Sequence, residues 1–156
     1  MDKKKRFKAF SDFPMVIGTV LESYNSLEES FNQIILSYFN PKSNIEDFKN
    51  ILLNSSVLDL GAKCKLFSNM TDFDQKIVEK IRRIGSIRNG IAHNNAMVSI
   101  NVEPQKNNRV ENVETKNIVQ IMNSSGRILN KELENEYYTF LELHEEISVY
   151  LQQYKS

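Results

Sequence analysis

Three side chains in one short segment, Arg88, Asn89 and His93, are of the types that together can cleave RNA. A histidine can remove the proton of a ribose 2′-hydroxyl, or donate a proton to the departing 5′-oxygen. An arginine can hold the phosphate oxygens and stabilise the charge that develops on them. Asn89 can donate its amide to the phosphate or hold the imidazole. Because the 2′-hydroxyl is itself the nucleophile, this chemistry needs neither a metal ion nor a cofactor.

Positive charge is concentrated just before this segment. Lys80, Arg82 and Arg83 stand close to Arg88, whereas the whole chain has a net charge of zero. A neutral protein is not expected to coat nucleic acid by bulk electrostatics. We therefore predict that these three cations form a small, local RNA-binding site. The alternative is a solvated helix face with no ligand.

Other catalytic classes lack their sequence signatures. The chain has no glycine-rich phosphate loop, no GxSxG elbow and no HExxH motif. Cys64 is the only cysteine, which excludes an internal disulfide and a thiolate metal cluster, and we interpret it as a structural thiol. His144, the other histidine, lies on an apolar stripe and is interpreted as a packed residue. We expect no metal site and no bound cofactor.

The spacing between Arg88 and His93 sets a geometric condition. In an unbroken helix, residues five positions apart point about 140° away from each other. Either Gly90 ends the helix and lets His93 turn back, or the working pair comes from two chains. The structural alternatives are an arginine that extends along the surface into water and a helix-end histidine bonded to a backbone carbonyl.

Apolar residues recur every three or four positions over most of the chain, which predicts a mainly α-helical fold. The fourth helix contains the candidate site, and Thr71 and Asp74 resemble a capping box at its start. Asn130 is the predicted N-cap of the last helix. The expected helices cover residues 14–39, 45–53, 57–69, 74–93 and 130–154.

Between the fourth and last helices the period changes to two. Val98, Ile100 and Val102 alternate with polar residues, and two further extended stretches follow at 110–113 and 118–122. We interpret residues 97–129 as a small inserted β-ribbon that buries few large side chains. Residues 1–156 are expected to form one domain with a basic N-terminal segment at 1–13. The chain has no apolar run of about 18 residues, so we expect a cytoplasmic protein with no membrane contact.

The segment IRRIGSIRNGIAHNN, residues 81–95, resembles the defining segment of the HEPN superfamily. That motif consists of an arginine, a polar residue directly after it, and a histidine separated from the arginine by a gap of four to six residues. Arg88, Asn89 and His93 match these three positions, with a gap of four. The preceding LGAKCKLF and the helix after it are similar to abortive-infection and mannitol-operon-repressor-like branches. The resemblance covers residues 14–95 and 130–154 and leaves the ribbon outside.

The resemblance implies a HEPN-like helical bundle, a homodimer that brings two motifs together, and metal-independent endoribonuclease activity as a toxin or antiphage effector, with RNA as substrate. A cognate antitoxin or another protein partner would accompany a toxin. The His-x-Tyr of HEPN toxins paired with nucleotidyltransferases is missing, because Asn95 stands where the tyrosine would be. Two other hypotheses remain open: a catalytically inactive HEPN interaction or regulatory module, and a small-ligand sensor with a pocket between helices.

Overall fold

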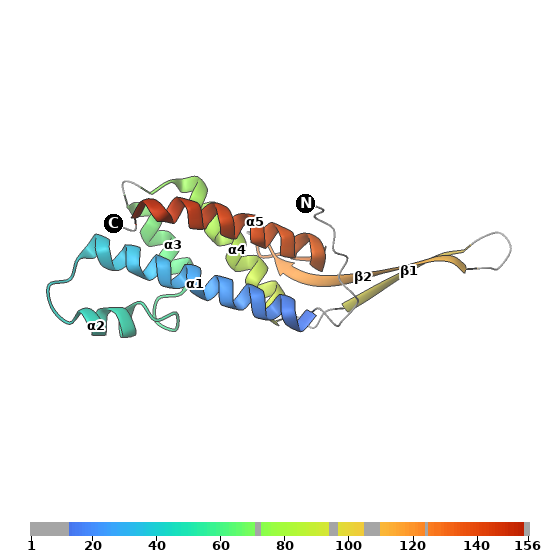
Figure 1. Ribbon diagram of the computed structural model, residues 1–156, viewed down its shortest axis with the longest axis horizontal. Coiled ribbons are helices and arrows are strands. Elements are labelled where there is room, and N and C mark those ends of the chain that lie inside the picture. Colours follow the sequence, from blue (N-terminus) through green and yellow to red (C-terminus); the bar gives the residue numbers. More distant parts are fainter. Residues whose placement is uncertain (1–12, 71–72, 94–96, 105–109, 124, 155–156) are drawn as a thin grey trace. The chain divides into compact units, whose positions relative to one another are not determined.

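The computed structural model describes residues 13–70, 73–93, 97–104, 110–123 and 125–154. They form a mainly helical fold with a small antiparallel sheet, as the sequence predicts (Figure 1). The chain divides into two compact units. Unit 1 comprises Met1–Leu21 and Ser86–Phe140, and unit 2 comprises Glu22–Gly85 and Leu141–Ser156.

Three long helices contribute residues to both units: α1 (Phe13–Phe39), α4 (Gln75–His93) and α5 (Leu133–Leu151). The expectation of a single domain therefore stays a prediction. The predicted basic segment 1–13 lies, apart from Phe13, outside the described residues. Among the helices of the described residues, none is long and apolar enough to cross a lipid bilayer.

The first helix follows its predicted apolar stripe closely. Its side chains at three- and four-residue intervals are buried from Val16 to Ile34. Tyr38, near the end of the helix, is half exposed at 51%. Two single residues with left-handed backbone, Asn40 and Asn44, lie between the end of this helix and the next element.

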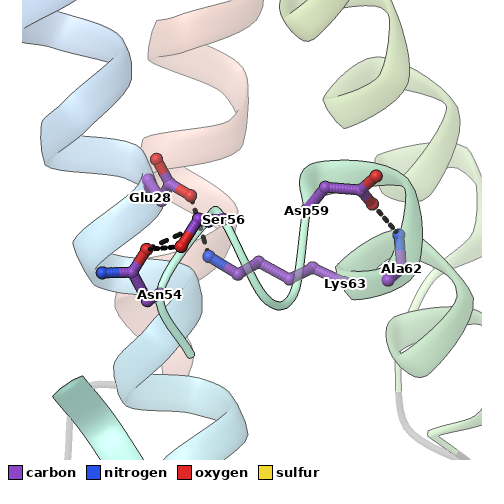
Figure 2. A network of polar contacts seen from close by, with 6 residues as sticks. All are labelled: Glu28, Asn54, Ser56, Asp59, Ala62 and Lys63. Carbon is purple, nitrogen blue, oxygen red and sulfur yellow. Dashed lines mark hydrogen bonds and ion pairs between the residues drawn. The ribbon is translucent and has the colours of Figure 1, made fainter. Parts of the chain in front are cut away.

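In unit 2, α2 (Ile45–Asp47) continues into a π-helix, η1 (Phe48–Leu52), and the two together match the second predicted helix. The third, α3 (Leu60–Asn69), begins three residues later than the predicted start at Val57. The reason is that the Asp59 carboxylate caps this helix and accepts a hydrogen bond of 2.8 Å from the backbone N–H of Ala62 (Figure 2).

An ion pair joins α3 to α1 inside unit 2. Lys63 is completely buried, and its Nζ lies 2.8 Å from Oε1 of Glu28, whose side chain is 20% exposed (Figure 2). Lys65, two residues further along the same helix, is exposed. The interior face of α3 is instead formed by Lys63, Cys64 and Phe67. A buried ammonium is tolerated only when a partner compensates for its lost hydration, and Glu28 is that partner.

Aromatic rings fill the core of unit 2. Phe67 meets the edge of Phe31 at a centroid distance of 5.6 Å and stacks on Phe73 at 4.6 Å. Such offset and edge-to-face contacts add to the free energy gained by burying the rings. Phe31 of α1 and Phe67 of α3 thereby pack against each other, and Phe73, which precedes α4, extends this aromatic cluster.

In unit 1 the predicted ribbon is a three-stranded antiparallel sheet in the order β1-β2-β3. The strands are β1 (Met97–Pro104), β2 (Val110–Met122) and β3 (Ile128–Glu132). The two extended stretches predicted at 110–113 and 118–122 are parts of the single strand β2. In the turn that follows, Asn123 accepts hydrogen bonds from the backbone N–H groups of Ser125 and Arg127, and Gly126 has a positive φ of 78°.

Two predictions about the end of the ribbon are wrong. Asn130 lies inside β3, so it is not the N-cap of the last helix, and α5 starts at Leu133. The sheet also buries more than expected, because Val119 is fully buried and Ile121 is 2% exposed. The C-terminal half of β2 is therefore part of the core of unit 1.

We predict that Lys63→Ala lowers the free energy of unfolding by about 3 kcal/mol, because it leaves the Glu28 carboxylate without its counter-ion. Urea denaturation followed by circular dichroism measures this change. Lys65→Ala, two residues along on the exposed side of α3, is the matched control and should change stability by less than about 0.5 kcal/mol. Equal stability of the two variants would show that the ion pair does not hold α3 in place.

Candidate functional site

Helix α4 carries every residue that the sequence singled out for chemistry. At its start, the Asp74 carboxylate accepts a hydrogen bond of 2.8 Å from the backbone N–H of Lys76. The backbone N–H of Asp74 itself donates to the hydroxyl of Tyr150 at 2.9 Å. The predicted capping partner, Thr71, lies outside the described residues. The backbone N–H groups of Asp74 and Lys76 at the helix start thus have side-chain partners, the hydroxyl of Tyr150 and the carboxylate of Asp74.

In unit 1 the end of α4 lies directly on β2. The hydroxyl of Ser86 donates a hydrogen bond to the carbonyl of Met122. One turn later, a Cβ on Gly90 would stand 2.6 Å from Cγ1 of Ile121 and 2.8 Å from the backbone oxygen of Gln120. Gly90 therefore allows α4 to pack closely against β2. The alternative in which Gly90 ends the helix is wrong. The α4 helix continues to His93.

Arg88 lies on the apolar side of α4, where the helical period places it beside Ile84 and Ile91. Both isoleucines are completely buried and Arg88 is partly buried. Its Nε atom is buried, so this part of the guanidinium is out of contact with water. Its Nη1 donates to Oδ1 of Asn89 at 2.9 Å. This hydrogen bond leaves the amide NH₂ of exposed Asn89 as a donor for an anion.

His93 occupies the last position of α4 and is exposed. None of the described residues forms a hydrogen bond with its imidazole, and residues 94–96, which follow it directly, lie outside the described part of the chain. Since α4 is unbroken from Arg88 to His93, the two side chains point about 140° apart. The structure thus joins Arg88 to Asn89 and leaves His93 of the same chain on another side of the helix.

The three predicted RNA-binding cations belong to unit 2 and differ in their surroundings. Lys80 forms a surface ion pair of 2.9 Å with Glu146, which is a weak interaction that a phosphate could displace. Arg82 is exposed and lies within hydrogen-bonding reach of the Cys64 thiol. Arg83 is partly buried. Of the three, Arg82 is the most accessible to a ligand.

Cys64 is buried in the core of unit 2, as expected of a structural thiol. Burial raises the pKa of the Cys64 thiol, and the neighbouring Arg82 opposes this shift only in part. A thiol held in its neutral form without access to solvent is a poor nucleophile and a poor metal ligand. Within the described parts of the chain, no group of three or more histidine, cysteine or acidic side chains could hold a metal ion.

Sequence reasoning missed Ser86, which joins Gly90 in fixing α4 on β2. The sequence does contain a signal for this contact: Ser86 and Gly90 are small residues four positions apart, so they lie on the same side of the helix. Another element can approach such a side closely. The sequence also gave no sign that Lys63 would be buried, since its partner lies on a different helix.

Comparisons with protein-family models, with curated proteins and with solved structures give no match. The HEPN resemblance therefore depends on Arg88, Asn89 and His93 themselves, and the function must be inferred from the chemistry of these side chains.

We predict that Gly90→Ala destabilises the protein by about 2 kcal/mol, because the new methyl group would overlap a backbone oxygen of β2 that cannot rotate away. Thermal or urea unfolding measures the loss.

Gly18→Ala is the matched control for this change. Gly18 also lies in a helix, α1, but nothing stands within 4 Å of a Cβ added there. The gain in helix propensity should stabilise this variant by about 0.5–1 kcal/mol. If Gly90→Ala were stabilised like Gly18→Ala, the close contact between α4 and β2 would be contradicted.

Proposed function

We propose that this protein is a metal-independent endoribonuclease of the HEPN type, in which Arg88, Asn89 and His93 act on RNA. The observation that carries the proposal is the arrangement at the end of α4. A guanidinium is fixed by a side-chain hydrogen bond to Asn89, and an exposed histidine follows five positions later on the same helix. These are the groups that a phosphodiester transfer through the 2′-hydroxyl requires.

In the proposed reaction, His93 of one copy takes the proton of the ribose 2′-hydroxyl. The 2′-oxygen attacks the adjacent phosphorus, and the bond from phosphorus to the 5′-oxygen breaks. The protonated imidazole of the partner's His93 donates a proton to the departing 5′-oxygen. Arg88 and Asn89 hold the non-bridging oxygens, where negative charge accumulates. The products are a 2′,3′-cyclic phosphate and a free 5′-hydroxyl, and DNA is not cleaved.

The proposal includes a homodimer with the two Arg88–His93 segments facing each other across a two-fold axis. One chain offers a single histidine at the site, and its Arg88 points about 140° away from it. A two-fold axis supplies the second histidine and the second arginine together.

Of the predicted RNA-binding residues, Arg82 is accessible, and Lys80 would exchange its ion pair with Glu146 for one with an RNA phosphate. A toxin or antiphage role, with an antitoxin as partner, is part of the same proposal.

A second candidate function, a catalytically inactive HEPN interaction module, is favoured by a different observation. Neither α2 nor the π-helix η1 buries a single residue, yet Ile45, Ile51, Leu52 and the nearby Val57 are 42–61% exposed. Several large apolar side chains exposed on one short segment are typical of a protein-binding surface. Absence of cleavage, together with a partner whose binding is lost in Ile51→Lys, would favour this function.

We predict that His93→Ala and Arg88→Ala each reduce RNA cleavage by about 10²- to 10⁴-fold, since each removes a group that acts in the transition state. Asn89→Ala should reduce it less, because Asn89 orients rather than transfers protons. The measurement is cleavage of a mixed RNA by purified protein, with product ends analysed for 2′,3′-cyclic phosphate. EDTA should have no effect.

His144→Ala is the control for this series, because His144 is the only other histidine and is not assigned to the site. It should retain wild-type activity. Circular dichroism must show that each variant is folded. If wild type and His93→Ala cleaved RNA equally, the activity would not belong to this site.

A further inference from the structure

Unit 2 contains a cavity of about 160 Å³ that the proposed RNA chemistry does not use. Its walls come from the end of α1, the connection between α3 and α4, and the short helix η2 (Gln152–Tyr154) that follows α5. The lining residues are Ile34, Ser37, Tyr38, Met70, Phe73 and Tyr154.

Two aromatic rings of the cavity wall are fixed by the protein itself. Phe73 stacks on Phe67 on one side and on Tyr154 on the other, at centroid distances of 4.6 and 5.8 Å with interplanar angles of 11° and 23°. The hydroxyl of Tyr154 is 3.1 Å from that of Tyr150, which in turn accepts the backbone N–H of Asp74. The rings are therefore held in place without a ligand, which reduces the entropy lost on binding.

The chemistry of the lining defines the ligand. None of these six side chains carries a charge near neutral pH, so within the described part of the chain a charged ligand would lose hydration without gaining a counter-ion. Phe73 is only 5% exposed, so the aromatic surface open to a ligand comes from partly buried Tyr154 and half-exposed Tyr38. The hydroxyls of Ser37, Tyr38 and Tyr154 supply polar groups for the edge of a ligand.

We propose that this cavity binds an uncharged, planar aromatic compound of nucleobase size, with polar groups on its edge. At protein packing density, the volume suits one such ring system of roughly eight to eleven heavy atoms. The ring would stack against the aromatic side chains, an interaction that tolerates different ring types. The proposal is independent of RNA cleavage, because none of the lining residues belongs to the proposed catalytic set.

The test uses adenosine, whose base alone would enter the cavity, and a matched pair of probes, neutral benzamide and charged benzoate. Binding is followed by two-dimensional ¹H–¹⁵N spectra of the full chain. Adenosine and benzamide should shift resonances of Ser37 and Tyr38 with dissociation constants on the order of 1 mM or below. Benzoate should bind at least about tenfold more weakly, because its carboxylate has no partner in the cavity.

Two variants connect binding to this cavity. Ser37→Phe places a ring into the cavity from an exposed position of α1 and should weaken adenosine binding at least about tenfold. Tyr38→Ala, which removes a half-exposed wall, should also weaken it. Ser26→Phe makes the same chemical change at an exposed position of α1 outside the lining and should bind as wild type does. No shifts up to about 10 mM probe, equal binding of benzoate and benzamide, or wild-type binding by Ser37→Phe would each overturn the proposal.

Discussion

The close approach of α4 to β2 at Gly90 determines where the candidate site can be. No side chain fits between the helix and the backbone of Gln120, and one turn earlier the hydroxyl of Ser86 bonds to the carbonyl of Met122. These two contacts hold the last turns of α4 against a strand whose Val119 and Ile121 are buried. A site on a helix fixed in this way is more precisely positioned than one on a loop.

The continuous helix through Gly90 also determines which of the site residues can act together within one chain. Because Gly90 lies inside a continuous helix, Arg88 faces the apolar side with its guanidinium bonded to Asn89, and His93 faces another direction. In one chain, a phosphate bound by Arg88 and the imidazole of His93 would therefore lie on different sides of α4. The helical period and the single histidine at the site favour the proposed catalysis by two copies.

Local features of the fold could be predicted from the sequence, and non-local ones could not. The period of apolar residues indicated α1 and the strand β1, because each depends on neighbours within a few positions. The burial of Lys63 depends on Glu28, 35 residues earlier, and the role of Gly90 depends on β2, some 30 residues later. The boundary error at Asn130 has a similar origin, since pairing with Gln120 overrides its preference for a helix N-cap.

The most direct test of the composite site is the effect of an inactive variant on the wild-type enzyme. Wild type and a ninefold excess of His93→Ala are unfolded together in urea, refolded to exchange subunits, and assayed for RNA cleavage. If each site needs His93 from both copies, random pairing leaves about a tenth of the activity of the same amount of wild type refolded alone. Activity unchanged by the excess variant would show that one chain cleaves RNA by itself and would contradict the account.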